Sequence, residues 1–260
     1  MSFVGTGRWI QMTDAEELMG MVLMATPVGD YDKRVVILTK ERGKITAFAR
    51  GARRPKSAML AKTQPFVFGV FRVIEGKNAY TLLGAEISNY FMEIREDVVR
   101  TCYGTYFLEL ASYYGRENDP ALDMLKLLYQ TLRALCLERI DKRLIRCIYE
   151  LKMFVVNGEY PECFHCIVCG GKDNLDHFSS RLGGVICSKC REGIHPLYDL
   201  AGSVLYTMQY IIATPVEHLY TFQVTEEVQH KLRRLMDIYM KDHIDREFHS
   251  LDILKTLEIA

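Results

Sequence analysis

Four cysteines in two pairs constrain this chain more than any other feature of its sequence. Cys166 and Cys169 form one C-x2-C pair, Cys187 and Cys190 form another, and 17 residues separate the pairs. Two residues between thiolates allow one tight turn to present both sulfurs to a single ion, and two such turns complete a tetrahedral shell. Glycine pairs beside both turns permit the necessary backbone bends. The spacing predicts one structural zinc ion per chain, with no open position for a substrate.

Two side chains just before the first pair could compete as ligands, Cys163 and His165. Cys163 followed by the first pair imitates the start of a ferredoxin run, C-x2-C-x2-C-x3-C. The fourth member of that run would fall at Asp173, so the ferredoxin interpretation fails, and we treat Cys163 as a spare thiol. The alternative of four unrelated buried thiols leaves the paired spacing unexplained.

The length and composition are those of an ordinary globular protein. A chain of 260 residues suggests one to three domains, and 49% hydrophobic with 25% charged residues is sufficient for real cores. No apolar run is long enough to cross a bilayer, and the N-terminus lacks the order of a secretory signal. We therefore expect a soluble cytosolic protein, in which eight cysteines favour metal binding or reduced thiols over disulfides.

The period of the apolar residues changes once along the chain. From about Gly20 to Ile87, short runs rich in Val, Ile, Phe, Tyr and Thr alternate with turn sequences. Five such strands indicate a small closed or nearly closed barrel. After Asn89 the pattern becomes helical, with Asp119-Pro120 as one expected helix start and one long helix expected from Thr225 to about residue 257.

These patterns predict an α+β protein. We expect an N-terminal OB-fold β-barrel, followed by a mainly α-helical domain into which the four-cysteine zinc module is inserted. The expected divisions are a mobile lead-in at 1–19 with Met12 as an alternative start, an OB-fold domain at 20–88, a helical domain at 89–160 and 199–260, and a zinc-binding module at 161–198.

Positive charge is concentrated in one stretch of an otherwise neutral chain. The whole sequence has 33 Lys and Arg against 33 Asp and Glu. Residues 33–62, however, contain ten cations and a single acid, Glu41, which makes this stretch +9 (10 − 1) and the remainder −9. Such segregation indicates a localised positive field on the N-terminal domain.

Nucleic acid is the partner that fits this field best. The cations lie on strand and turn sequence, which counts against the amphipathic helix that a lipid surface requires. Small OB-type barrels bind single strands through a basic groove and aromatic stacking, and Phe48 falls on the polar-facing side of its strand, with Tyr80 as a second candidate. Two alternatives remain: the cations form a merely solvated face, or the basic barrel is an adaptor that docks an acidic protein without binding DNA directly.

Signatures of catalysis are missing from the sequence. There is no G-x-x-x-x-G-K-[ST], no G-x-S-x-G and no H-E-x-x-H, and "GTGRWI" lacks the third glycine of a dinucleotide fingerprint. A binding protein is therefore favoured over an enzyme. A zinc-dependent nucleic-acid enzyme is the rival from a different class.

Three stretches resemble the RecO family of bacterial recombination mediators. "GMVLMATPVGDYDKRVVILTKERGKITAFARGARRPKS" is similar to the N-terminal OB domain of that family, and "NGEYPECFHCIVCG…GGVICSKC" is similar to its zinc module. "DREFHSLDILKTL" resembles the C-terminal end of the family. The likeness extends from about Gly20 to Leu257, which is nearly the whole chain.

The resemblance implies a function in DNA repair and recombination after DNA damage. Members bind single- and double-stranded DNA, anneal complementary strands, bind the C-terminal tail of single-stranded DNA-binding protein (SSB), and act with RecR to load RecA. It also implies a bacterial, cytoplasmic, nucleoid-associated protein. By position it assigns zinc to Cys166, Cys169, Cys187 and Cys190, and DNA binding to Arg34, Lys40, Arg42, Lys44, Arg50, Arg53, Arg54 and Lys56, to which the stacking argument adds Phe48.

A site for the SSB tail is a weaker hypothesis. A tail that ends in acids and an aromatic residue needs cations beside an apolar groove. The predicted helix "DKRLIRCIYELKMF" offers apolar side chains next to four cations, Lys142, Arg143, Arg146 and Lys152. The alternative, an ordinary amphipathic core helix with a basic outer face, has at least equal weight.

Overall fold

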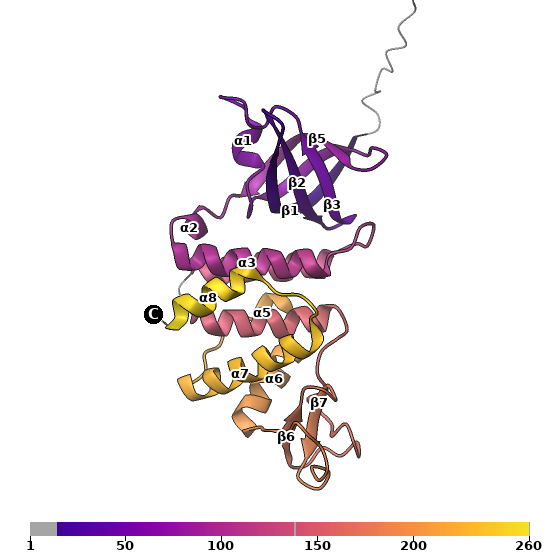
Figure 1. Cartoon of the computed structure of the whole chain (residues 1–260), viewed down its shortest axis with the longest axis vertical. Coiled ribbons are helices and arrows are strands. Elements are labelled where there is room, and N and C mark those ends of the chain that lie inside the picture. Colours follow the sequence, from indigo (N-terminus) through magenta and orange to yellow (C-terminus); the bar gives the residue numbers. More distant parts are fainter. Residues whose placement is uncertain (1–14, 138, 260) are drawn as a thin grey trace, which may run out of the picture. The chain divides into compact units, whose positions relative to one another are not determined.

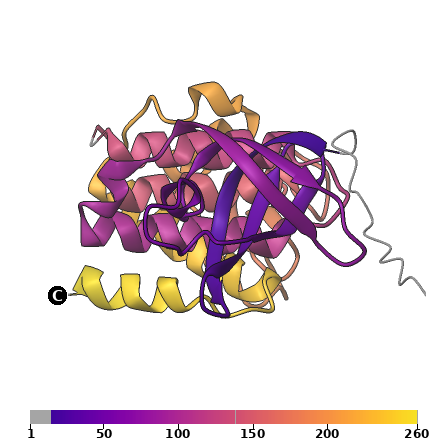
Figure 2. The same cartoon turned by 90° about the horizontal axis from the view of Figure 1, so that it is seen from above.

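The chain divides into two compact units, which are described separately. The computed structural model describes residues 15–137 and 139–259. The first unit consists of the chain up to Tyr90 together with Gly115–Leu125, and the second unit consists of the remainder. Figures 1 and 2 show the helices and strands of both units in two views.

The first unit contains a closed barrel of five strands in the order β1-β2-β3-β5-β4. Neighbouring strands are antiparallel except for the parallel pair β3 and β5. The bounds are β1 Ala15–Val28, β2 Asp32–Thr39, β3 Gly43–Ala49, β4 Phe68–Ile74 and β5 Tyr80–Asn89, with the short helix α1 Met59–Lys62 between β3 and β4. The barrel confirms the expected OB-like fold.

The start of the barrel differs from the expected lead-in. Strand β1 begins at Ala15 and pairs with β4 from there, so residues 15–19 belong to the barrel. The rest of the expected lead-in, including Met12, lies outside the described residues. The strand begins earlier than the apolar pattern indicated because its first residues, "AEEL", pair with β4. Leu18 is buried, the Glu17 side chain is exposed, and the half-buried Glu16 carboxylate pairs with Arg42.

Alternation of side chains along β2 and β3 builds the barrel core. Ile45, Ala47 and Ala49 on β3 point inward and are buried, whereas Phe48 points outward and is 37% exposed. Val35 and Ile37 on β2 face the same interior. Because successive strand residues face opposite sides, the residues between these positions are directed to the outer side of the barrel. The inward and outward assignment predicted for β3 is therefore correct.

The segment Gly115–Leu125 belongs to the barrel unit because it pairs with the β2–β3 turn. The backbone N–H of Lys44 donates to Arg116 O at 2.9 Å, and the N–H of Asn118 donates to Arg42 O at 2.9 Å. Gly43 permits this approach: its φ is +63°, and a Cβ there would lie 2.2 Å from Arg116 O. The contact places the side chains of residues 117 and 118 beside the beginning of β3.

The second unit is mainly helical. Its elements are α2 Met92–Arg95, α3 Val98–Tyr114, α4 Leu122–Cys136, α5 Lys142–Val156, α6 Gly202–Ala213, the 3-10 turn η2 Val216–His218, α7 Glu226–His243 and α8 His249–Ile259, although the first turn of α4, up to Leu125, belongs to the first unit. Helix α4 starts at Leu122, two residues after the expected position. In place of the long helix expected from Thr225 there are two helices, α7 and α8, which the non-helical residues 244–248 separate. Helix α5 is the most buried, with every side chain from Leu144 to Phe154 in the interior.

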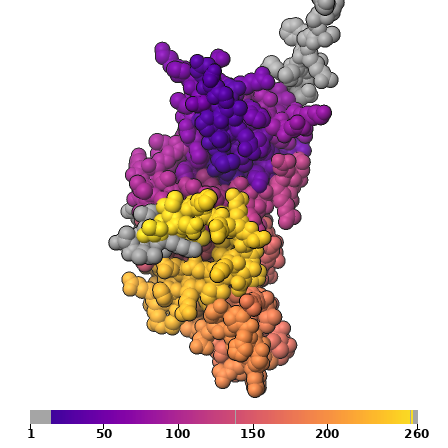
Figure 3. Space-filling model, viewed as in Figure 1, coloured from indigo at the N-terminus to yellow at the C-terminus, as the bar shows by residue number. Residues whose placement is uncertain are grey.

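The cysteine-rich segment adds a small three-stranded sheet to the second unit. Its strands are β6 Leu175–Ser179, β7 Gly184–Cys187 and β8 Tyr198–Asp199, in the order β7-β6-β8. Phe178 contacts Tyr239 of α7 with ring centroids 6.1 Å apart, and Gln209 of α6 donates to Cys163 O at 2.7 Å. The orange surface in Figure 3 shows this segment as one lobe. Among the described helices, none combines the length and apolar character that a membrane span requires.

Candidate nucleic-acid interface and metal centre

The four paired cysteines converge on one point. The sulfurs of Cys166, Cys169, Cys187 and Cys190 all lie within 4.8 Å of one another. The first pair is set by a tight turn in which the N–H of Gly170, at φ +73°, donates to Cys166 O at 2.8 Å. The second pair follows β7, and the N–H of Cys190 donates to Cys187 O at 3.0 Å. The sequence therefore correctly predicted that distant turns would meet.

The geometry of the sulfurs fits a tetrahedral metal ion. Four sulfurs at about 2.3 Å from a zinc ion would lie about 3.8 Å from one another. Cys169 Sγ and Cys187 Sγ are 3.8 Å apart. These four residues could therefore hold a metal ion. Cys163 and His165 are not part of this group within the described chain: Cys163 is buried elsewhere, and His165 is half exposed beside Glu162.

Burial and hydrogen bonds shift the pKa values of two of the four thiols in opposite directions. Burial opposes ionisation of Cys166, but the backbone N–H groups of Cys187, Cys169 and Val168 outweigh it and lower the pKa of this thiol to about 6. Hydrogen bonds with Cys187 and Cys169 raise the pKa of Cys190 to about 12. Several thiolates in one small volume repel, and a divalent cation at their centre would relieve that repulsion.

Five of the predicted DNA-binding cations gather with Phe48 at one end of β2 and β3. Arg34 and Phe48 are cross-strand partners, and both are exposed on the outer side of the barrel. The segment after β3 is also exposed. We call this group the basic surface, and it consists of Arg34, Phe48, Arg50, Arg53, Arg54 and Lys56.

Contacts with the β1–β2 turn fix the shape of the basic surface. The N–H of Arg53 donates to Tyr31 O at 2.8 Å, and its guanidinium donates to Gly29 O at 3.1 Å. The guanidinium of Arg54 lies 5.5 Å from the centre of the Tyr31 ring. Tyr31 is 50% exposed, so the surface presents two aromatic rings, Tyr31 and Phe48, among its cations.

The other three predicted contacts lie at the opposite end of the same strands. Arg34 lies near the start of β2, and Lys40 follows the end of that strand six residues later, which corresponds to roughly 20 Å of extended chain. Arg42 makes two hydrogen bonds to the carboxylate of Glu16, at 2.7 and 3.1 Å, and is thus neutralised internally. Lys44, at the start of β3, is half-buried. The structure therefore does not bring Lys40, Arg42 and Lys44 into the basic surface.

Two further cations of the +9 stretch serve the barrel itself. Lys33 points inward and donates to Thr63 Oγ1 at 3.0 Å, and Lys62 donates to Ala85 O at 2.6 Å. Charge counted along a sequence thus overstates the charge available at a surface.

The four cations proposed for an acidic tail do not form a surface. Arg146 is buried, bonded to Glu150 at 2.8 Å and to Asp237, and Lys152 donates to three backbone carbonyl oxygens, of Ile211, Ile212 and Thr214. Arg143 pairs with Asp141 at 2.7 Å, and Lys142 is half-buried in the first turn of α5. The helix belongs to the core, and its cations mainly satisfy internal partners. The alternative interpretation as a core helix is the better one.

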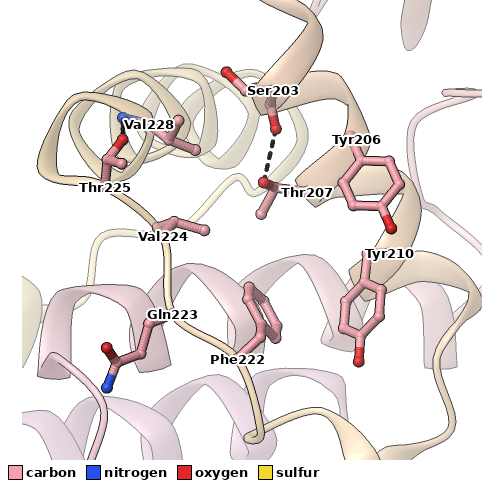
Figure 4. A pocket seen from close by; sticks show the side chains of 9 residues that line it. All are labelled: Ser203, Tyr206, Thr207, Tyr210, Phe222, Gln223, Val224, Thr225 and Val228. Atoms are coloured by element: carbon pink, nitrogen blue, oxygen red, sulfur yellow. Dashed lines mark hydrogen bonds between the residues drawn. The ribbon is translucent and has the colours of Figure 1, made fainter.

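The structure adds two pockets that the sequence did not reveal. One, of about 230 Å³, lies in the first unit beside the β4–β5 turn, whose sequence "EGKN" had suggested only a turn. The other, of about 530 Å³, lies in the second unit and is apolar. Figure 4 shows its wall, where Tyr206 and Tyr210 project from α6. The rings of Tyr210 and Phe222 pack edge to face, with their centroids 4.9 Å apart.

The chain combines an OB-like barrel, which has an exposed basic and aromatic surface, with a helical unit that carries a four-cysteine centre. This is the architecture of a two-part protein of DNA repair and recombination. Family models agree with this architecture in both parts. A model described as "Recombination protein O N terminal" matches residues 12–91, and one described as "Recombination protein O C terminal" matches residues 95–252. The chain belongs to the RecO family of DNA repair and recombination proteins.

Curated relatives match the chain along nearly its whole length. It is 35% identical to "DNA repair protein RecO" of Alkaliphilus metalliredigens over 242 residues, which cover 92% of this chain and 98% of the relative. It is 31% identical to the protein of the same name from Acetivibrio thermocellus over 242 residues, covering 92% and 96%. The Bacillus subtilis relative is 30% identical over 239 residues, covering 92% and 93%.

Proposed function

We propose that this chain is a recombination mediator that binds single- and double-stranded DNA through its barrel and anneals complementary strands. The observation that carries the proposal is the basic surface, where five exposed cations accompany two exposed aromatic rings, Phe48 and Tyr31. Lys and Arg neutralise phosphates, and aromatic rings stack on bases of any sequence. An acidic protein partner would use the cations, but its carboxylates would not stack on the rings.

The position of this surface on the barrel supports the same function. OB-type barrels bind oligonucleotides across strands 2 and 3 and through the turns that border them. The basic surface includes positions on β2 and β3 and contacts the β1–β2 turn through Arg53 and Arg54. A single strand that lies across β2 and β3 would therefore have cations near its phosphates and aromatic rings near its bases.

Annealing requires no covalent chemistry on this proposal. Two complementary strands repel through their phosphates, and a protein that places cations along both lowers the repulsion until base pairing can begin. Base pairing then supplies the driving force, so no nucleotide is hydrolysed. We accordingly propose a non-enzymatic, cytoplasmic and nucleoid-associated protein.

The four-cysteine centre is proposed to hold one structural zinc ion. Four sulfur ligands close the coordination shell, so the ion would stabilise the fold of residues 161–198 and leave no position for a substrate. When bound, zinc would connect the two cysteine turns, which are otherwise held near each other by the small three-stranded sheet.

RecR, RecA and the acidic tail of SSB are proposed as partners, with RecA reached indirectly. A tail that ends in an aromatic residue needs an apolar cavity, and the pocket between Tyr206, Tyr210 and Phe222 meets that need better than α5 does.

Binding of a labelled single-stranded oligonucleotide, followed by fluorescence anisotropy at moderate salt, tests the main proposal. We expect saturable binding that weakens steeply as salt rises. The adaptor alternative predicts no binding to the oligonucleotide and saturable binding to an acidic polypeptide. The enzyme alternative predicts shortened or modified DNA after incubation with a divalent metal ion.

A further inference from the structure

A second, chemically different site lies on the barrel beside the β4–β5 turn. This β4–β5 pocket, of about 230 Å³, lies wholly within the first unit. It is smaller than the roughly 300–1,000 Å³ of pockets for drug-sized ligands, so it suits a single small group. The side chains that carry its chemistry are Lys44, Glu75, Lys77, Asn78, Tyr80 and Glu117.

The pocket is continuous with the basic surface along β3. Outward-facing residues alternate along this strand, and Phe48 of the basic surface is followed by Thr46 and then Lys44, which both line the pocket. Residues of the β4–β5 turn form the opposite wall. A single strand that stacks on Phe48 and continues along β3 would therefore reach the pocket within a few nucleotides.

The mixture of charges favours a neutral group over a phosphate in this pocket. Two carboxylates, of Glu75 and Glu117, face two ammonium groups, so the lining has no net charge and would repel an anion about as much as attract it. Within the described chain, the side chains of Lys77 and Asn78 have no hydrogen-bond partner. The pocket thus offers both donors and acceptors to a neutral ligand.

A nucleobase has this combination of neutral charge, donors and acceptors. Carboxylates accept hydrogen bonds from the exocyclic amine of cytosine, and an amide side chain can pair with the donor and acceptor of adenine. Uracil and thymine have a carbonyl oxygen where cytosine has the amine, and this oxygen would face the carboxylates unfavourably. Burial and the neighbouring Glu75 raise the pKa of Tyr80, which keeps its hydroxyl protonated as a further donor.

We propose that the β4–β5 pocket binds one unstacked nucleobase that carries an exocyclic amine, with Glu75 and Glu117 as its acceptors. The inference rests on the proposed function, because a base reaches the pocket only when the barrel binds a single strand. It adds base preference to a protein whose phosphate contacts alone would read no sequence.

Oligo-dC and oligo-dU of equal length, about 16 nucleotides, test the proposal, since cytosine and uracil are pyrimidines of equal size that differ in the exocyclic group on C4 and in the proton on N3. Wild-type protein should bind oligo-dC about three- to tenfold more tightly, the discrimination expected of one or two hydrogen bonds. The double variant Glu75→Ala/Glu117→Ala should bring the affinity ratio close to one. Both residues are exposed, so the fold should survive, as circular dichroism can verify.

Glu86→Ala is the matched control, because Glu86 is an exposed acid on the same barrel that does not line the pocket. It should retain the wild-type ratio. If the two acids only repelled the DNA backbone, the double variant would bind both oligonucleotides more tightly with an unchanged ratio, which would overturn the proposal. A wild-type ratio of one would also overturn it. Failure of wild-type protein to bind either oligonucleotide would instead refute the proposed function.

Discussion

Arg146 and Glu150 form an ion pair in the interior of the helical unit, one turn apart on α5. Nε of Arg146 lies 2.8 Å from Oε1 of Glu150, and the two side chains are 1% and 0% exposed. Glu150 also accepts from the hydroxyl of Tyr106 on α3 at 2.6 Å, and Arg146 also bonds Asp237 on α7. Burial opposes the charge on Arg146, but the adjacent carboxylates raise its pKa above the usual value. The pair therefore joins three helices.

Removal of one member should destabilise the protein strongly. Arg146→Ala leaves the Glu150 carboxylate buried without its cation, and the expected cost is about 3–5 kcal/mol in the free energy of unfolding. Urea denaturation of the full chain measures it. Arg143→Ala, which removes an exposed cation of the same helix, should cost less than about 1 kcal/mol. Equal losses in both variants would contradict the assignment of Arg146 to the core.

Arg53 should contribute to the salt dependence of DNA binding. In Arg53→Ala, the slope of log affinity against log salt on single strands should become shallower by about 0.7 for one lost phosphate contact. Arg42→Ala removes the same charge, but its guanidinium is already paired with Glu16, so its slope should match the wild type. A salt titration of anisotropy gives both slopes. An unchanged slope in Arg53→Ala would show that this residue contacts no phosphate.

Phe48 should act by stacking and not by charge. Phe48→Ala should weaken binding to single strands by about 1–3 kcal/mol while leaving the salt slope intact, because a ring neutralises no phosphate. Binding to duplex DNA should change less, since paired bases are not available for stacking. Leu83→Ala, which truncates another exposed apolar side chain of the barrel, is the control and should bind as the wild type does. Equal effects of Phe48→Ala on single strands and duplex would argue against stacking.

Metal content and module stability should change together. Elemental analysis of protein purified without chelator should find about one zinc per chain. Chelation should increase hydrogen exchange in residues 161–198 and leave the barrel strands protected. Cys166→Ser should lose the metal, whereas Cys163→Ala should retain it, because Cys163 is outside the sulfur cluster. Metal-free protein with unchanged protection in this segment would show that the site is not structural.

The features that the sequence predicted correctly depend on local periodicity or on fixed spacing. Alternation in "KITAFAR" predicted that Phe48 lies on the outer face of β3. The two C-x2-C pairs, which begin at Cys166 and Cys187, predicted that two distant turns meet. Both follow from covalent geometry, which the order of residues determines directly.

The incorrect predictions concern cations whose exposure and partners depend on packing against distant parts of the chain. Arg42 and Arg53 are indistinguishable in a count of cations, but Arg42, in the β2–β3 turn, pairs with Glu16 of β1. Among the residues that the structure describes, Arg53 donates to backbone oxygens alone. In α5 the period correctly predicted the helix, yet one carboxylate that pairs with Arg146, that of Asp237, comes from α7, 91 positions later. Register and tertiary contact, and not periodicity, determine such pairs.

The pairing of Gly115–Leu125 with the β2–β3 turn has a consequence for how the protein is made. The five strands come from one stretch of chain, but the first unit also includes Gly115–Leu125, which follows α2 and α3. A fragment that stops at Tyr90 would therefore leave the N–H of Lys44 and the carbonyl of Arg42 without their partners. On the ribosome, the N-terminal domain would accordingly have to wait for residues beyond α3 to emerge before its final contacts could close.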